Sequence, residues 1–374
     1  MKKKYLKLIG VAALILCLML TGSWLLWRQV YYAKASNRFV PLTAPPRVSI
    51  LPATDQTVSY STKLLFMGDT MLARTIGQGI VAGDNPYEYV QNTLDDYNFR
   101  MANMETTIAE PSVSVQAIGK PYTFNAPLAA IQILKDAHID VAGLANNHTG
   151  DFGPAAMANM IDNLQAAGIK VAGAGKNINQ AFTPLIVNVP AVAVGKVDSK
   201  TKTETVRLAI IAVNSIENSY TNATSTSAGS AFFDKARIVT EIQTARQTDK
   251  ADIIIVFPHW GIEYQSAPTS EQISWGHFFI DSGADIVIGS HPHVIQSTED
   301  YQGKYIVYSL GNFIFDGMSG NALNGQMVSL TINVADKLTS TSNGKVTLDQ
   351  RNVSLASPQT IPVQINAQGY PELN

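Results

Sequence analysis

The segment IVIGSHPHVIQ, residues 286–296, closes a short apolar run with two histidines that are separated by one proline. A continuous apolar run of this length is typical of a strand that is buried on both faces of a parallel sheet. His291 and His293 are two of only six histidines in the chain. Alternate residues of an extended segment point the same way, so we expect both imidazoles to face one site.

The pattern of this segment recurs on both sides of it. Amphipathic segments that predict helices occupy residues 87–97, 127–137, 155–168, 235–247 and 270–283. Apolar runs that predict strands occupy residues 64–69, 99–106, 140–148, 169–175, 206–214, 251–261, 284–293, 304–315, 326–335 and 345–355. Alternating units of this kind predict an α/β domain. The last three strands follow one another without helices, which predicts antiparallel additions, in a mixed sheet or a second sheet.

The composition limits the class of protein. Of the 374 residues, 46% are hydrophobic and 15% are charged, and the net charge is −2. Such a chain can supply a packed core, and its charge balance does not suggest the electrostatic footprint of a nucleic-acid-binding protein. The single cysteine, Cys17, lies in an N-terminal apolar run. Any metal site in the rest of the chain must therefore use histidine, carboxylate or asparagine ligands.

The N-terminus predicts a membrane anchor. A lysine-rich tail, residues 1–7, precedes an uncharged run, residues 8–27, that is long enough to span a bilayer as a helix. A cleaved signal peptide is the alternative, with an A-x-A-like site at residues 33–36. We favour the anchor because the apolar run is long for a signal peptide. Residues 28–62 are interpreted as a linker and residues 63–374 as one domain outside the cytoplasm, held at the cell membrane by a single pass.

Polar side chains follow five of the predicted strands. These residues are Asp69; Asn103 and Glu105; Asn146, Asn147 and His148; His259; and His291 and His293. Ligands of α/β proteins bind outside the carboxyl ends of strands, and these side chains are the ones that divalent cations prefer. The sequence therefore predicts a metal site. The remaining histidines, His138 and His277, are interpreted as structural, and no GxSxG or Walker motif is present.

Six motifs point to a known family. In chain order they are FMGDTMLAR, NMETTI, ANNHTGDFG, HWGIEY, GSHPHVIQ and YSLGNFIFD. Over residues 63–318 the chain resembles the CapA family of membrane-anchored bacterial proteins of poly-γ-glutamate capsule biosynthesis. That family is similar to the calcineurin-like metallophosphoesterases. The resemblance implies a two-sheet sandwich flanked by helices, preceded by one N-terminal transmembrane helix.

The resemblance also implies roles for individual residues. Two metal ions would be held by Asp69, Glu105, Asn147, His259, His291 and His293. His148 would protonate a leaving group, and Asp151 would orient it. We expect Arg74 and Asn146 to bind an anionic substrate, and Asn312 to support the site. Imidazole ligands favour Mn, Fe or Zn over Mg.

The chain departs from the phosphoesterase pattern at two positions. Met71 stands where the first motif of those enzymes has a histidine, and Glu105 stands where the second has an aspartate. We therefore keep two hypotheses for the function. The first is a metal-dependent hydrolase that acts on a phosphoester or on polyglutamate. The second is a non-catalytic subunit of a poly-γ-glutamate synthesis and export complex, whose metal site is structural or binds a polyanion. Other capsule synthesis subunits are expected partners in either case, and nucleic acid is not.

Overall fold

The part of the chain that can be described excludes the expected anchor. The computed structural model describes residues 55–117, 119–194, 203–216, 221–340 and 346–373. The expected cytoplasmic tail, transmembrane segment and alternative cleavage site, and residues 28–54 of the expected linker, lie outside these residues. Among the helices that are described, none combines the length and the apolar character needed to cross a bilayer. The described residues belong to one unit, Asp55–Ser340 together with Val346–Asn374.

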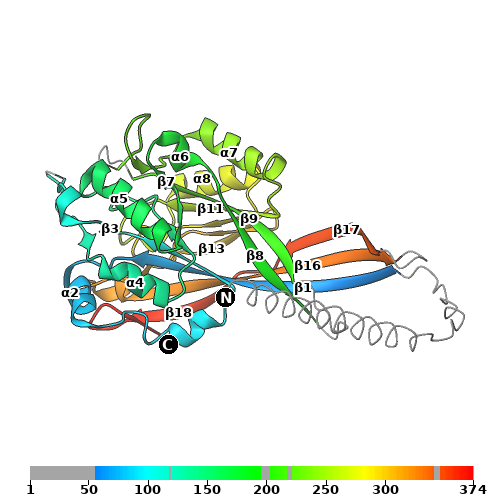
Figure 1. Ribbon diagram of the computed structural model, residues 1–374, viewed down its shortest axis with the longest axis horizontal. Coiled ribbons are helices and arrows are strands. Elements are labelled where there is room, and N and C mark those ends of the chain that lie inside the picture. Colours follow the sequence, from blue (N-terminus) through cyan, green and yellow to red (C-terminus); the bar gives the residue numbers. More distant parts are fainter. Residues whose placement is uncertain (1–54, 118, 195–202, 217–220, 341–345, 374) are drawn as a thin grey trace, which may run out of the picture. The chain divides into compact units, whose positions relative to one another are not determined.

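Two halves of a hydrogen-bonded network of strands form the centre of this unit (Figure 1). The first half contains β8 (Leu185–Ala193), β9 (Glu204–Asn214), β11 (Ile253–His259), β12 (Ile286–Ile288), β13 (Thr298–Tyr301) and β14 (Lys304–Val307). The second contains β1 (Asp55–Thr70), β2 (Phe99–Met104), β5 (Val141–Gly143), β6 (Lys170–Ala172), β15 (Asn312–Ile314), β16 (Asn324–Ser340), β17 (Val346–Leu355), β18 (Gln359–Ile365) and β19 (Pro371–Leu373). Antiparallel pairing of β8 with β1 joins the two halves, so the expected two sheets are continuous.

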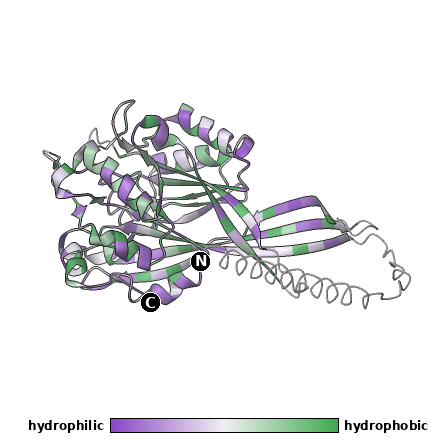
Figure 2. Cartoon of the chain, in the orientation of Figure 1, coloured by the Kyte–Doolittle hydropathy of each residue, from purple (hydrophilic) through white to green (hydrophobic). Residues whose placement is uncertain are grey.

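An apolar core lies between the two halves. Alternate residues of a strand point to opposite faces, and Leu64 and Phe66 of β1 belong to this inner core. The rings of Phe66 and Phe257, from β1 and β11, lie 6.4 Å apart and so connect the halves directly. Leu65 and Met67 point the other way, into the core under the helices of the second half. The central strands are accordingly rich in hydrophobic residues, whereas the helices are mixed (Figure 2).

Helices cover the outer face of each half. Against the second half lie α2 (Arg74–Ala82), α3 (Gln91–Asp95), α4 (Ala129–Asp136) and α5 (Gly153–Ala166). Against the first half lie α6 (Ile178–Phe182), α7 (Lys235–Gln247) and α8 (Ser270–Asp281). Short additional elements are β3 (Thr107–Ile108) paired with β4 (Asn125–Ala126), β7 (Ala174–Gly175) paired with β10 (Gly229–Ser230), and the 3-10 turns η1 (Pro111–Val113) and η2 (Gly320–Leu323). This arrangement confirms the predicted mixed α/β class.

The end of the linker and the extent of the strand at residues 304–315 are among the predicted boundaries that differ from the structure. The expected linker runs to residue 62, but residues 55–62 are the first half of β1 and pair with β16. Serine and threonine dominate there and resemble a tether, yet Val58 and Tyr60 are buried. The predicted strand 304–315 is divided into β14 and β15, because Gly311 has a φ of 69° and turns the chain. The far ends of β1, β16 and β17 extend beyond the helices (Figure 1).

The topology brings many strand ends to one edge. In the first half β9, β11, β12 and β14 are parallel neighbours, and in the second half β1, β2 and β5 are parallel neighbours. At this edge Asp69 pairs with Asn312 within the second half, and a bridge joins His259 to Ser290 within the first half. His293 Nδ1, from the first half, lies 3.1 Å from Asp69 Oδ2, from the second half. Side chains that follow these strands therefore converge, as expected for the ligand-binding edge of an α/β sheet.

Candidate metal centre

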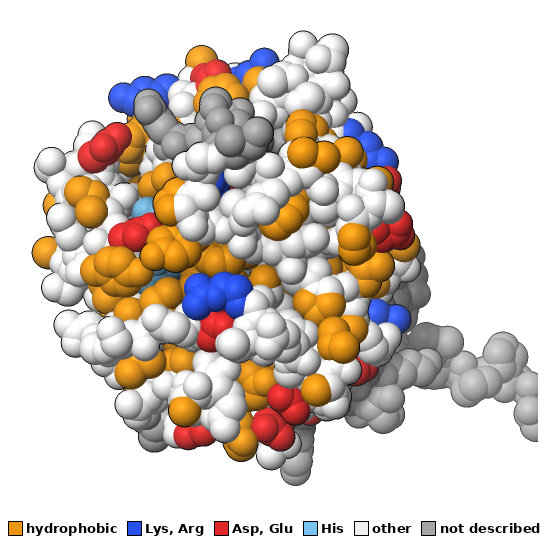
Figure 3. Space-filling view, turned by 90° about the vertical axis from the view of Figure 1, so that its left-hand side faces the viewer, with side chains coloured by type: hydrophobic (Ala, Val, Ile, Leu, Met, Phe, Trp, Pro, Cys, Tyr) orange, Lys and Arg blue, Asp and Glu red, His pale blue; other side chains and the backbone are white. Residues whose placement is uncertain are grey.

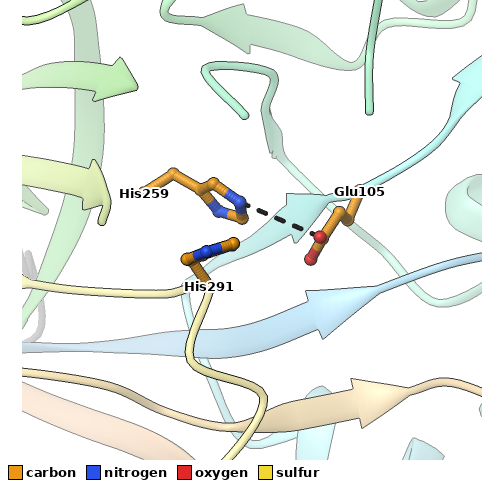
Figure 4. A group of neighbouring side chains, drawn as sticks. All are labelled: Glu105, His259 and His291. Atoms are coloured by element: carbon orange, nitrogen blue, oxygen red, sulfur yellow. Dashed lines mark ion pairs between the residues drawn. The ribbon is translucent and has the colours of Figure 1, made fainter. Parts of the chain in front are cut away.

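Five buried ligand-type side chains meet at the carboxyl ends of the strands. Asp69 is the penultimate residue of β1, Glu105 follows β2, His259 ends β11, and His291 and His293 follow β12. They form two overlapping groups, each with ligand atoms within 4.8 Å of one another: Asp69, Glu105 and His293; and Glu105, His259 and His291. Figure 4 shows the second group, with the Glu105 carboxylate facing His259. Glu105 belongs to both groups, which is the arrangement that a bridging carboxylate requires.

The histidine loop, residues 289–293, has a backbone conformation that the sequence does not indicate. The predicted extended segment is wrong here, because β12 ends at Ile288 and both His291 (φ 100°) and His293 (φ 58°) have left-handed backbones. Such conformations cost on the order of 1–3 kcal/mol for residues other than glycine, and they cluster at functional sites. The loop is held in place partly because the His291 amide donates to Asp69 Oδ2 at 3.3 Å. The two imidazole centres lie 5.9 Å apart.

Further buried side chains fix the orientation of these groups. Asn312 Oδ1 lies 2.8 Å from His293 Nδ1, and its amide nitrogen donates to the backbone carbonyl of His293, so both polar groups of Asn312 contact that histidine. Asn103 donates to Asp69 Oδ1 at 2.8 Å. Ser290 Oγ lies 3.1 Å from His259 Nδ1. Contacts of this kind hold metal ligands in one orientation.

Asn146 and Asn147 have different surroundings. The Asn147 side-chain oxygen lies 2.8 Å from His259 Nε2, so it is adjacent to the group of candidate ligands. Asn146 is fully buried, and its amide nitrogen donates to Asn103 Oδ1 and to the carbonyl of Met104. Its oxygen accepts from the backbone amides of His148 and Thr149. These contacts use the polar groups of Asn146 to shape the loop, and its contact with a substrate stays a prediction.

His148 lies beside the candidate centre, in contact with Asp151. Its Nδ1 lies 2.8 Å from Asp151 Oδ2, and the same oxygen accepts the backbone amide of Phe124. The Phe124 ring lies against the imidazole, with centroids 4.3 Å apart. With Nδ1 bound to Asp151, the Nε2 atom is the one that remains for a ligand.

Lys120 was missed by the sequence analysis. It forms an ion pair with the buried Asp151 carboxylate, and its Nζ lies 3.2 Å from His148 Nδ1. Burial lowers the pKa of His148, the Asp151 carboxylate acts in the opposite direction, and the Lys120 charge lowers the pKa again. Lysine in a loop is usually solvated, so nothing in the sequence distinguishes this one from the others.

A pocket of about 210 Å³ opens beside the centre. Its lining includes Tyr122, Phe124, Tyr264 and Phe315 as aromatic walls, and Arg74, Glu263, His148 and His293 as polar groups. Arg74 is 41% exposed and pairs with Asp316 at 3.1 Å, so its guanidinium lies at the rim. Figure 3 shows histidine side chains inside a hollow whose edge carries hydrophobic, acidic and basic side chains.

The electrostatics of the centre match a cation. Burial and the Asp69 carboxylate raise the pKa of Glu105 well above its usual value. Burial lowers the pKa of His293, but Glu105 and Asp69 together raise it to about 10. Burial and neighbouring histidines lower the pKa values of His259 and His291 well below the usual value. Neutral imidazoles beside paired carboxylates are the donor set of a divalent transition-metal ion.

Two buried atoms support the same conclusion. Glu105 Oε1 and His291 Nδ1 have no hydrogen-bond partner in the described part of the chain. Glu105 Oε1 lies 3.8 Å from His259 Nε2 and 3.7 Å from His293 Nε2. Unsatisfied buried polar atoms are costly, and a cation between these groups would satisfy them. The residues present therefore fit a metal centre.

Comparisons with known proteins agree with the motifs. A family model described as bacterial capsule synthesis protein PGA_cap matches residues 63–317. The capsule biosynthesis protein CapA of Bacillus anthracis is 28% identical over 68% of this chain and 59% of its own length. The PGA biosynthesis protein CapA of Bacillus subtilis is 28% identical over 70% of this chain and 66% of its own length. A Mycobacterium tuberculosis relative, 26% identical over 66% of this chain and 63% of its own length, is named a probable polyglutamine synthesis accessory protein.

The matched region thus spans about 60% to two thirds of these relatives. Among solved structures, the calcineurin-like phosphoesterase YfkN of Bacillus subtilis aligns with a TM-score of 0.40 and 13% identity, over 80% of this chain and 91% of that one.

Proposed function

Since the chain belongs to the bacterial capsule synthesis protein PGA_cap family, we propose that it acts in capsule or poly-γ-glutamate biosynthesis through a metal-dependent hydrolytic site. The observation that carries this proposal is Glu105, whose carboxylate is shared by two groups of buried ligands. The substrate would be a phosphoester or a polyglutamate-related polymer. The protein would be anchored in the cell membrane by residues 8–27, with the domain outside the cytoplasm and other synthesis subunits as partners.

The ligands of two divalent ions would be Asp69, Glu105, Asn147, His259, His291 and His293. Three imidazoles favour Mn, Fe or Zn over Mg. When bound, such ions would polarise a phosphoryl or carbonyl oxygen of the substrate and neutralise the charge that develops on it. The aromatic walls of the adjacent pocket would limit the access of water to the reacting group.

The remaining polar residues of the pocket bind substrate and move a proton. Arg74, at the rim, would pair with an anionic group, because a guanidinium matches phosphate and carboxylate oxygens. His148 would donate a proton from Nε2 to the leaving oxygen, while Asp151 holds Nδ1. Burial keeps the pKa of His148 low until an anionic substrate is nearby, and that negative charge would favour the protonated imidazole.

The second candidate is a non-catalytic subunit of a synthesis and export complex. Met71, which is fully buried, replaces the histidine expected in the first motif and removes one strong ligand. One relative is also named as an accessory protein of polymer synthesis. In this case the centre would bind a polyanion or stabilise the fold.

Turnover by the full chain distinguishes the two candidates. The full chain is loaded with Mn²⁺ and tested on an activated phosphodiester and on poly-γ-glutamate, with His148→Ala as the variant. We expect His148→Ala to keep its metal and to lose turnover by about 10²–10⁴-fold, the usual contribution of a general acid. Full metal loading with no turnover on either substrate would favour the non-catalytic subunit.

A further inference from the structure

Glu263 faces the metal centre from a loop that none of the expected roles includes. The loop follows β11, and Glu263 lines the same pocket as His148 and His293. One carboxylate oxygen of Glu263 and one nitrogen each of His291 and His293 lie within 4.8 Å of one another. Glu263 itself is exposed. The Glu263 carboxylate thus lies near the buried His291 and His293 on the solvent side of the centre.

The loop that carries Glu263 is fixed against the histidine loop. The amide of Tyr264 donates to the carbonyl of Pro292 at 2.7 Å, between the two histidines of the SHPH segment. Gln296 donates to the carbonyl of Gln265 at 2.8 Å. Tyr264 has a left-handed backbone with a φ of 63°, a strained conformation that persists only where the surroundings enforce it. The position of Glu263 relative to the histidines is therefore determined by the fold.

The buried ligands leave a place for a further donor. The group of Asp69, Glu105 and His293 has three protein donors. A fourth donor would be expected at the position of Met71, but Met71 is buried, and its sulfur accepts a hydrogen bond from the backbone amide of Ala73 at 3.1 Å. His291, which is only 4% exposed, has an Nδ1 atom with no partner in the described residues. His291 and His293, one residue from each observation, are the two histidines whose ligand atoms lie within 4.8 Å of a Glu263 carboxylate oxygen.

We propose that Glu263 is a metal ligand that closes the solvent side of the centre and supplies the donor that Met71 does not. This inference rests on the proposed metal-dependent function and deepens it. A third carboxylate adds a hard oxygen donor and negative charge, which favours Mn²⁺ or Fe²⁺ over softer ions. Because Glu263 lies on the exposed edge of the pocket, it would also be the ligand that an entering anionic substrate displaces most easily.

Metal binding by the full chain tests this role without reference to activity. The chain is stripped with a chelator, reloaded with Mn²⁺ and dialysed; Mn per chain is measured by elemental analysis and affinity by calorimetry. Glu263→Gln keeps the shape of the side chain and removes its charge. Glu88→Gln is the matched control, because Glu88 is an exposed glutamate outside the pocket. Thermal unfolding of each metal-free protein checks that the fold is intact.

We expect Glu88→Gln to match the unaltered chain, and Glu263→Gln to bind its weaker Mn²⁺ at least about tenfold less tightly, or to lose it on dialysis. Equal stoichiometry and affinity in Glu263→Gln and the unaltered chain would overturn the role of Glu263 and leave the proposed function standing. If neither the unaltered chain nor Glu88→Gln takes up Mn²⁺, both the role of Glu263 and the metal-dependent function are wrong.

Discussion

Individual residues at the centre are held by contacts that leave little freedom. His148 is a clear case, because Asp151 binds one ring nitrogen and Phe124 covers one face of the ring. Lys120 completes this group by forming an ion pair with Asp151, whose side chain is fully buried. A buried carboxylate needs such a partner, since an isolated charge in the interior is strongly unfavourable.

Replacing Lys120 should therefore destabilise the fold. We expect Lys120→Met to lower the free energy of unfolding by about 3 kcal/mol, because it leaves the Asp151 charge buried without its ion pair. Lys176→Met is the control: Lys176 pairs with Asp162 on the surface, and exposed pairs contribute about 0–1 kcal/mol. Denaturant unfolding measures both variants. Equal losses for the two would show that the Lys120–Asp151 pair has no special importance.

The charge state of His293 predicts how metal binding depends on pH. Without a cation, the neighbouring carboxylates hold the pKa of His293 at about 10, so the imidazole is protonated near neutral pH. A metal ion must displace that proton, and its affinity should rise about tenfold per pH unit between pH 6.5 and 8.5 if one proton is released. Calorimetry in buffers of different ionisation enthalpy counts the released protons. A metal affinity that does not change with pH, together with no release of protons on binding, would contradict the displacement of a proton from His293.

Among the elements, β1 connects the parts of the molecule. Its residues 55–66 pair with β16, Tyr60 and Ser61 also pair with β8, and Asp69 near its end belongs to the candidate metal centre. Val58 and Tyr60 are buried on the first half, within the core that both halves of the strand network share. The strand is therefore both a structural link and the carrier of a ligand.

A chain that begins at residue 63 should consequently be less stable than one that begins at Asp55. Removing residues 55–62 exposes the partner positions of β16 and deletes the buried Val58 and Tyr60 side chains, each worth about 1.5–3 kcal/mol. Thermal unfolding and solubility of the two truncated chains compare them directly. If both chains unfold at the same temperature, the first half of β1 contributes nothing to the domain.

The sequence predicts the strand ends well and the loops poorly, for physical reasons. Asp69, Glu105 and His259 lie at the ends of apolar runs that predict buried strands. Because the carboxyl ends of parallel strands meet at one edge of a sheet, the convergence of these side chains could be predicted. Lys120 and Glu263 lie on loops that reach the centre only through tertiary contacts. The left-handed backbones of the SHPH segment likewise depend on contacts with distant residues, and no local pattern indicates them.

For the molecule as a whole, the candidate metal centre lies where the two halves of the strand network meet. Asp69 and Glu105 come from the second half, whereas His259, His291 and His293 come from the first. A bound cation would therefore link the halves, in addition to the hydrogen bonds between β8 and β1. Ligands that bind only the folded state stabilise it in proportion to the logarithm of their concentration.

Metal loading should raise the stability of the whole domain. At a free Mn²⁺ concentration 100 times the dissociation constant, we expect about 2.7 kcal/mol of additional stability, lost on addition of a chelator. Calorimetric scans with and without Mn²⁺ measure this, and His259→Ala should remove most of the effect. A transition temperature that is the same with Mn²⁺ and with chelator would contradict a cation that links the two halves.

Anomalous diffraction from a crystal of the Mn²⁺-loaded protein tests the central claim most directly, because it locates the ions themselves. We predict two anomalous peaks, one among Asp69, Glu105 and His293, and one among Glu105, His259 and His291, with Glu105 contacting both. No peak at the carboxyl ends of the strands, or ions bound only elsewhere on the molecule, would contradict the metal centre and the function that we derive from it.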